Sequence, residues 1–221
     1  MEATYRFSDW TEDAANEFLV LVVDDDAAVR EAVSGLFASI GLRVVQHTTA
    51  EALLAAPLPE QPSCIVLDIS LGGLSGLELQ TRLRKDGIHT PIVFLSGVGD
   101  VPMTVSAMKA GAINFIAKPF RDQELIDAVF EALHLDVQRR AELARTAALR
   151  IGFASLTPRE RDAMTLLARG LSNKQVADML DISPATVKTY RAQTMKKMQA
   201  RSFAELVTMA RALDLVTAQP D

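Results

Sequence analysis

The chain has 221 residues, of which 49% are hydrophobic, and its net charge is −5. This length suits two domains, and the single cysteine, Cys64, excludes an internal disulfide and a cysteine-based zinc site. No apolar stretch approaches the roughly 20 residues of a membrane helix, and the N-terminus lacks the pattern of a signal peptide, so we expect a cytoplasmic protein that does not associate with membranes.

Residues 1–17 are polar and acidic, and we interpret them as an N-terminal arm. From residue 18 to residue 135, short apolar runs alternate with amphipathic segments. This alternation is typical of a parallel sheet covered by helices on both faces, so the predicted fold class is α/β, with a doubly wound five-stranded sheet. The predicted strands are 18–23, 43–46, 64–67, 92–95 and 113–116, and the predicted helices are 27–40, 50–55, 76–84, 101–110 and 121–135.

Residues 136–154 predict a helical linker, because they are rich in helix formers and contain no Gly or Pro before Gly152. We interpret the basic residues of this stretch, which include Arg139 and Arg140, as a solvated face.

Residues 155–213 predict a small all-α domain, followed by a tail at 214–221. Capping boxes start at Thr157, Ser172 and Ser202, and Ser183-Pro184 opens a further helix. Gly170 is expected to end the first of these helices. The connection at 180–183 is short enough for a helix-turn-helix.

The two predicted domains differ in charge. Residues 18–135 carry 8 Lys/Arg against 14 Asp/Glu, whereas residues 155–211 carry 10 against 5. The acidic half is suited to hold a cation, and the basic half is suited to face phosphates.

Charged residues follow three of the apolar runs in the acidic half. Asp24 and Asp25 follow the first run, Asp68 ends the third, and Lys118 follows the last. The carboxyl ends of parallel strands meet at one edge of a sheet, where ligands bind. Carboxylates gathered there repel one another unless a hard cation lies between them, and oxygen ligands favour Mg²⁺. A lysine beside them suits a phosphoryl group.

These motifs, in this order, resemble those of a known family. Residues 18–135 resemble the CheY-like receiver domain of two-component response regulators, and residues 155–211 resemble the LuxR-type helix-turn-helix. The combination is similar to the FixJ/NarL class of response regulators.

The resemblance implies a role for each matching residue of the receiver. Asp68 matches the phosphoacceptor, and Asp24, Asp25, Asp68 and the Ser70 carbonyl match the Mg²⁺ site. Ser96 and Lys118 match the residues that contact the phosphoryl group, and Ser96 and Phe115 match the residues that switch conformation.

The sequence departs from the family pattern at Gly72. Family members usually carry proline four residues after the acceptor, whereas here the segment is Ser70-Leu71-Gly72-Gly73. Two glycines increase the freedom of this loop. We therefore expect a phosphoryl lifetime or a metal affinity that differs from those of relatives.

The predicted third helix of the basic domain has two faces. Val187, Thr194 and Met198 share one side, which is expected to pack on the domain core. The other side is expected to face DNA, with Lys188, Thr189 and Ala192 at the bases. The residues expected to contact phosphates are Lys174, Arg191, Gln193, Lys196 and Lys197.

The sequence therefore predicts a DNA-binding transcriptional regulator that is phosphorylated on Asp68 by a sensor histidine kinase and is not an enzyme. A homodimer is expected on phosphorylation, and RNA polymerase is a further candidate partner. Two alternatives stay open. One is a DNA-binding or interaction protein that acts without phosphorylation, and the other is a Mg²⁺-dependent phosphotransfer enzyme, for which we find no acid/base residue or substrate pocket.

Overall fold

The computed structural model describes residues 17–97 and 101–216. The chain forms two compact units that divide between Arg140 and Ala141. The predicted arm at 1–17 lies outside the described residues except for Glu17, and so does most of the predicted tail. No helix within 17–97 or 101–216 is long and apolar enough to cross a membrane.

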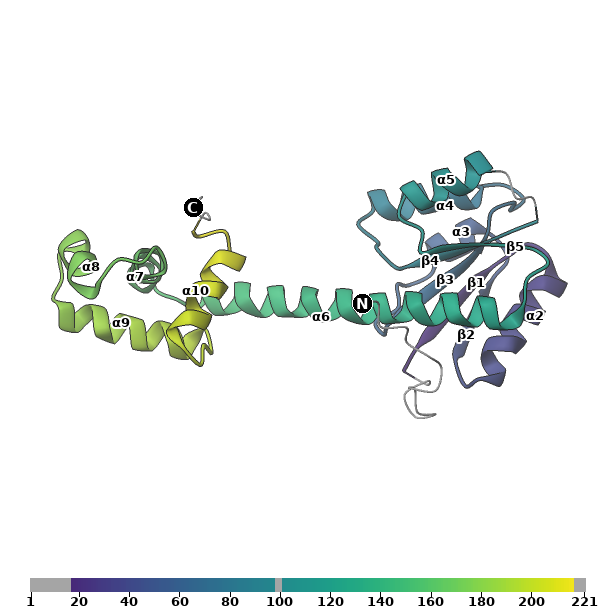
Figure 1. The fold of residues 1–221 in the computed structure, drawn as a ribbon. Coiled ribbons are helices and arrows are strands. Elements are labelled where there is room, and N and C mark those ends of the chain that lie inside the picture. Colours follow the sequence, from purple (N-terminus) through teal and green to yellow (C-terminus); the bar gives the residue numbers. More distant parts are fainter. Residues whose placement is uncertain (1–16, 98–100, 217–221) are drawn as a thin grey trace. The chain divides into compact units, whose positions relative to one another are not determined.

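The first unit contains a five-stranded sheet with the order β2-β1-β3-β4-β5, in which every neighbouring pair is parallel (Figure 1). This arrangement confirms the predicted fold class. The chain order reverses between β1 and β3, and ligands bind at such a point in open α/β sheets. The strands are β1 (Leu19–Val23), β2 (Arg43–His47), β3 (Ser63–Asp68), β4 (Ile92–Ser96) and β5 (Asn114–Ala117).

Helices cover both faces of this sheet (Figure 1). One face packs against α2 and α6, and the other packs against α3, α4 and α5. The helices are α2 (Ala27–Ser39), α3 (Ala50–Ala55), α4 (Gly76–Lys85), α5 (Val101–Lys109) and α6 (Asp122–Ala154).

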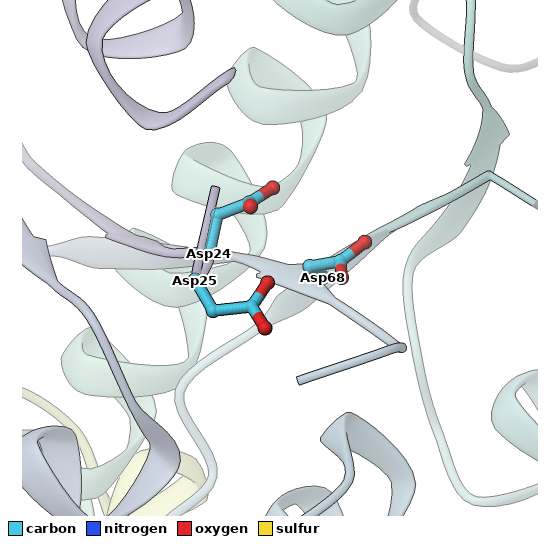
Figure 2. Close-up of side chains that lie close together, drawn as sticks. All are labelled: Asp24, Asp25 and Asp68. Carbon is cyan, nitrogen blue, oxygen red and sulfur yellow. The ribbon is translucent and has the colours of Figure 1, made fainter. Parts of the chain in front are cut away.

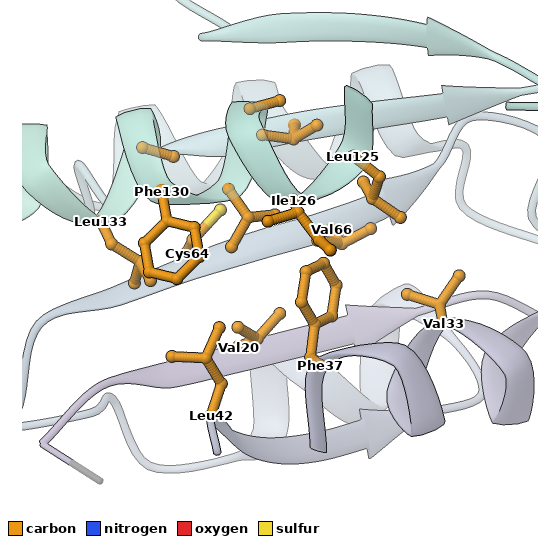
Figure 3. Close-up of a cluster of buried hydrophobic side chains, with 14 of the residues drawn as sticks. Val20, Val33, Phe37, Leu42, Cys64, Val66, Leu125, Ile126, Phe130 and Leu133 are labelled. Atoms are coloured by element: carbon orange, nitrogen blue, oxygen red, sulfur yellow. The ribbon is translucent and has the colours of Figure 1, made fainter. Parts of the chain in front are cut away.

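The central strands β1, β3 and β4 are buried along their whole length, which is why each is apolar nearly throughout. Successive residues of β3 point to opposite faces. Cys64 and Val66 join the core beneath α2 and α6 (Figure 3), whereas Ile65 and Leu67 join the other core. Burial, together with the nearby Asp136 carboxylate, raises the pKa of the Cys64 thiol, so this cysteine is an inert core residue.

The basic residues near the unit boundary correct our sequence interpretation. Arg139 and Arg140 are not a solvated face, because both pair with the fully buried carboxylate of Asp136 at 2.6 and 2.7 Å. Nothing in the sequence around Asp136 distinguishes it from a surface residue of an amphipathic helix. Only the packing of α6 on the sheet places it in the interior.

The described part of the second unit, up to residue 216, contains the C-terminal part of α6 and four further helices. Thr157 and Ser172 form the predicted capping boxes, and Ser183 caps the helix that begins with Pro184. Three residues, 181–183, connect α8 to α9, as in a helix-turn-helix. The helices are α7 (Pro158–Ala168), α8 (Asn173–Leu180), α9 (Pro184–Lys197) and α10 (Phe203–Ala212).

Two details of these helix ends were tested by the structure. Gly170 follows the last helical turn of α7 with φ of +91°, as expected for a glycine that ends a helix. The capping box predicted at Ser202 is wrong in part. Ser202 accepts a hydrogen bond from the Glu205 amide, but the Glu205 carboxylate accepts one from the Arg201 amide in place of Ser202.

Candidate functional site

Three carboxylates gather at the carboxyl ends of β1 and β3. Asp24 and Asp25 follow β1, and Asp68 is the last residue of β3. One oxygen from each lies within 4.8 Å of the others, and Figure 2 shows the three side chains together. Asp24 and Asp68 are 1% and 5% exposed, whereas Asp25 faces solvent. Asp25 is therefore the solvent-exposed member of the cluster.

Local hydrogen bonds fix the acidic pair after β1. The Asp24 carboxylate accepts from the Asp26 amide at 2.9 Å, and Asp26 in turn caps α2. Arg30, one turn into α2, donates to the Asp24 carbonyl at 2.8 Å. The Gly72 amide donates to the Asp25 carboxylate at 3.0 Å. These bonds hold both carboxylates toward β3 without neutralising them.

Lys118, which follows β5, supplies a positive charge to the cluster. Its Nζ donates to Asp24 at 2.8 Å and to Asp68 at 3.0 Å. Burial raises the pKa of Asp24 despite the bond from Lys118. Burial acts to lower the pKa of Lys118, but its bonds to the two carboxylates outweigh this effect, and the pKa lies above its ordinary value. Three carboxylates thus lie around one ammonium group, which bonds to two of them, so negative charge is in excess.

The donor set fits a magnesium ion. Hard divalent cations take carboxylate and carbonyl oxygens, and the excess negative charge of the cluster favours a cation there. The described residues contain one group of at least three acidic, His or Cys side chains spaced for a metal, and it is this cluster.

The structure also places the other predicted residues of the receiver. Ser96 ends β4, is 1% exposed, and its carbonyl accepts from the Lys118 amide at 2.7 Å. The Ser70 amide donates to Asp68 at 3.1 Å, which places the residue predicted as a carbonyl ligand directly beside the acceptor. Phe115 lies in β5 and pairs with Phe94 of β4. It is half-buried and packs against the core that contains Ile65 and Leu67. The residues 98–100 beyond Ser96 lie outside the described part of the chain.

Gly76 is a residue of the site that the sequence analysis missed. It begins α4, and a Cβ added there would lie 2.5 Å from the Asp68 carbonyl and 3.2 Å from Leu67 Cγ. Only glycine lets the helix approach the acceptor strand this closely. A glycine directly after a capping serine was the one available signal, and it does not specify a close approach.

In the second unit, α9 has the two faces predicted from its sequence. Val187, Thr194 and Met198 are buried, which confirms the core face. Lys188, Thr189 and Ala192 are exposed. Gln193 and Lys196 are also exposed on α9, and Lys174 is exposed in the first turn of α8.

Two basic residues predicted to contact phosphates take part in contacts within the unit. The Arg191 guanidinium lies over the Phe203 ring, 4.1 Å from its centroid. Lys197 donates to the buried Glu160 carboxylate at 2.7 Å and lowers the pKa of that carboxyl. Charge patterning along α9 could not reveal these two contacts, because Phe203 and Glu160 lie on other helices.

Comparison with known proteins places both units. The response regulator receiver domain matches residues 20–130, and the LuxR family of bacterial regulatory proteins matches residues 154–210. Nodulation protein W of Bradyrhizobium diazoefficiens is 48% identical over 92% of this chain and 89% of its own length. The transcriptional regulatory protein FixJ of Azorhizobium caulinodans is 46% identical over 86% of this chain and 90% of its own. The solved structure of the response regulator StyR is 44% identical and covers 88% of this chain and 98% of its own, with a TM-score of 0.81.

The chain belongs to the response-regulator family, in the class that joins a receiver domain to a LuxR-type DNA-binding domain. This combination defines a regulator of transcription that responds to phosphorylation. The family predicted from the sequence is confirmed.

Proposed function

We propose that Asp68 accepts the phosphoryl group that controls this protein, and that a sensor histidine kinase is the donor. A carboxylate oxygen of Asp68 attacks phosphorus, while the bond from phosphorus to the donor breaks and the donor leaves. Such a transfer depends on positioning and on charge neutralisation. The observation that carries this proposal is the cluster of three carboxylates in which Lys118 pairs with the buried Asp24 and Asp68.

The neighbouring residues would bind the metal ion and contact the phosphoryl group. Asp24, Asp25, Asp68 and the Ser70 carbonyl would hold Mg²⁺, which would offset the negative charge on the phosphoryl oxygens. The Lys118 ammonium, already bonded to Asp68 at 3.0 Å, would move onto a phosphoryl oxygen. Ser96, at the end of the adjacent strand β4, would donate its hydroxyl, and Phe115 would change rotamer as the β4 and β5 ends are drawn inward.

Incubation with acetyl phosphate and Mg²⁺, followed by intact-mass measurement, tests this assignment. The wild-type chain is expected to gain one phosphoryl group, and Asp68→Asn is expected to gain none. Asp86→Asn, which removes an exposed carboxylate at the end of α4, is the matched control and should react like wild type. Phosphorylation of Asp68→Asn at the wild-type level would contradict the proposal.

Two measurements separate the alternatives. Continuous hydrolysis of acetyl phosphate at a rate independent of Asp68 phosphorylation would indicate an enzyme. Full regulation of DNA binding by Asp68→Asn would indicate a protein that works without phosphorylation.

We propose that α9 reads DNA through Lys188, Thr189 and Ala192. Their exposure on one side of the helix supports this role, and exposed Lys174, Gln193 and Lys196 would contact phosphates. Arg191 and Lys197 would contribute less than their charge suggests, because each already has a partner within the unit. DNA selection with and without phosphorylation is expected to recover one preferred DNA sequence. Lys188→Ala should relax the base preference at one position of that sequence.

Phosphorylation is expected to act through dimerisation of the receiver, which would align two DNA-binding domains on paired half-sites. A beryllium fluoride mimic should then increase the sedimentation coefficient. An unchanged coefficient would remove dimerisation from the mechanism. RNA polymerase would be the partner at the promoter, and the protein would act in the cytoplasm.

A further inference from the structure

The buried carboxylate of Asp136 lies at the end of β3 opposite to Asp68. Its side chain is fully buried on α6 and accepts a hydrogen bond at 2.9 Å from the amide of Ser63, the first residue of β3. Arg139 donates to its Oδ1 at 2.6 and 2.8 Å, and Arg140 donates to its Oδ2 at 2.7 Å. Both carboxylate oxygens are therefore satisfied and fixed in direction.

Arg140 extends this network beyond the helix. Its Nη1 donates to the Glu60 carbonyl at 2.7 Å, and its Nη2 donates to the Pro59 carbonyl at 3.0 Å. One guanidinium thus joins α6 to the Pro-rich loop that leads into β3. We call Asp136, Arg139, Arg140 and the Ser63 amide the Asp136 anchor.

The anchor differs in kind from the other contacts of α6 with the sheet. Upstream, Leu125, Val129 and Leu133 pack on the sheet through apolar surfaces, which are non-directional and tolerate small shifts. The anchor uses directed, charge-assisted bonds to one strand. It stands at the last residues of the first unit, and α6 continues without interruption to Ala154.

We propose that the Asp136 anchor is the positioning contact through which phosphorylation of Asp68, at the other end of β3, is transmitted to the linker segment of α6, residues 141–154. β3 is buried from Ser63 to Asp68 and carries the acceptor at one end and the anchor at the other. One continuous buried strand therefore joins the acceptor to the anchor, and a rigid element of this kind carries coupling when it can take two arrangements. This inference rests on the proposed phosphorylation of Asp68, and it assigns Asp136 a positioning role rather than a catalytic one.

Two variants of the full chain test the anchor. Asp136→Asn keeps the shape but removes the charge, and Arg140→Gln removes the bonds to Glu60 and Pro59 while Asp136 keeps Arg139 and the Ser63 amide. Glu142→Gln makes the same charge change as Asp136→Asn at an exposed position of the same helix and is the control. Arg140→Gln decides the test if Asp136→Asn does not fold.

Three measurements are compared for each variant: phosphorylation by acetyl phosphate, hydrogen exchange of residues 136–145, and the ratio of DNA affinities with and without phosphorylation. The probe is a duplex selected with the phosphorylated wild-type protein. We expect wild-type phosphorylation, faster exchange, and a DNA affinity ratio that falls at least five-fold in Arg140→Gln and further in Asp136→Asn.

An unchanged ratio together with faster exchange would show that the anchor only stabilises the fold, and would overturn the inference. Unchanged exchange in both variants would also overturn it. If wild type itself accepts no phosphoryl group, the proposed function fails, and the coupling fails with it. If wild type is phosphorylated normally and only the variants keep their ratio, the inference alone fails.

Discussion

The two ends of β3 carry buried carboxylates in opposite electrostatic situations. At the carboxyl end, Asp68 and Asp24 share Lys118, and the third carboxylate, Asp25, is exposed to solvent. At the amino end, Asp136 is paired with two arginines, accepts a hydrogen bond from a backbone amide and is closed to solvent. The difference shows two uses of a buried carboxylate. A carboxylate with its own cationic partners is fixed in place by them, whereas a cluster with more carboxylates than cations is suited to bind a further cation.

Removing the charge at each end should have opposite effects on stability. Asp136→Asn leaves two guanidinium groups without their carboxylate, so the free energy of unfolding of the receiver should fall by about 3 kcal/mol. Asp68→Asn relieves like-charge repulsion and should leave the free energy of unfolding unchanged or raise it. Calorimetric unfolding of the two variants checks this, and an equal loss in both would contradict the comparison.

The close packing of Gly76 against the acceptor strand β3 offers a second test. Gly76→Ala places a Cβ against the Asp68 carbonyl and should cost about 2 kcal/mol in stability while slowing phosphorylation. Gly35→Ala is the matched control, because a Cβ there meets no atom within 4 Å in the middle of α2. It should stabilise the receiver by about 0.5–1 kcal/mol. Equal effects of the two changes on urea unfolding would exclude the close approach.

The Glu160 carboxylate extends the comparison to the second unit, since it is buried and paired with Lys197. The bond from Lys197 lowers the pKa of Glu160 below its ordinary value of 4.5. The pair therefore stabilises the unit above about pH 4.5, and this contribution is lost as the pH falls through the lowered pKa. Lys197→Met should cost about 1 kcal/mol at pH 7, a figure already reduced because Lys197 is 36% exposed, and less at pH 3.

Lys196→Met is the control for this pair, because Lys196 is exposed on the same turn of α9. It should leave unfolding unchanged and reduce the slope of log DNA affinity against log salt by about 1. If Lys197→Met reduced this slope more than Lys196→Met, Lys197 would be a residue that contacts phosphates.

The smallest expected effect concerns Gly72, whose amide donates to the exposed Asp25 of the acidic cluster. Proline at position 72 has no amide hydrogen, so Gly72→Pro removes the bond to the Asp25 carboxylate. Magnesium affinity, measured by titration calorimetry, should weaken by about three-fold, as for the loss of one exposed hydrogen bond. Gly72→Ala keeps the amide, although its Cβ would lie 3.3 Å from the Asp25 carboxylate, and should weaken affinity less. Unchanged magnesium affinity and phosphoryl lifetime in Gly72→Pro would reject a role for this glycine.

The sequence by itself determined the parts that local patterns encode. The apolar runs defined the strands, most clearly β1, β3 and β4, because strands buried on both faces are apolar nearly throughout. Thr157, Ser172 and Ser183 marked helix starts, because a cap is made within four residues. Asp68 ends its strand and Lys118 directly follows its strand, which placed both at one edge, since all strands of the sheet are parallel.

Only the tertiary structure decided which charges are matched. Asp136 meets the Ser63 amide 73 residues away, Glu160 meets Lys197 37 residues away, and the approach of Gly76 to the acceptor strand depends on how α4 packs. The neighbours in the chain gave Arg139, Arg140, Arg191 and Lys197 the pattern of solvated or DNA-facing residues. Whether a charge is paired depends on distance in space and on burial, and neither quantity is local in sequence.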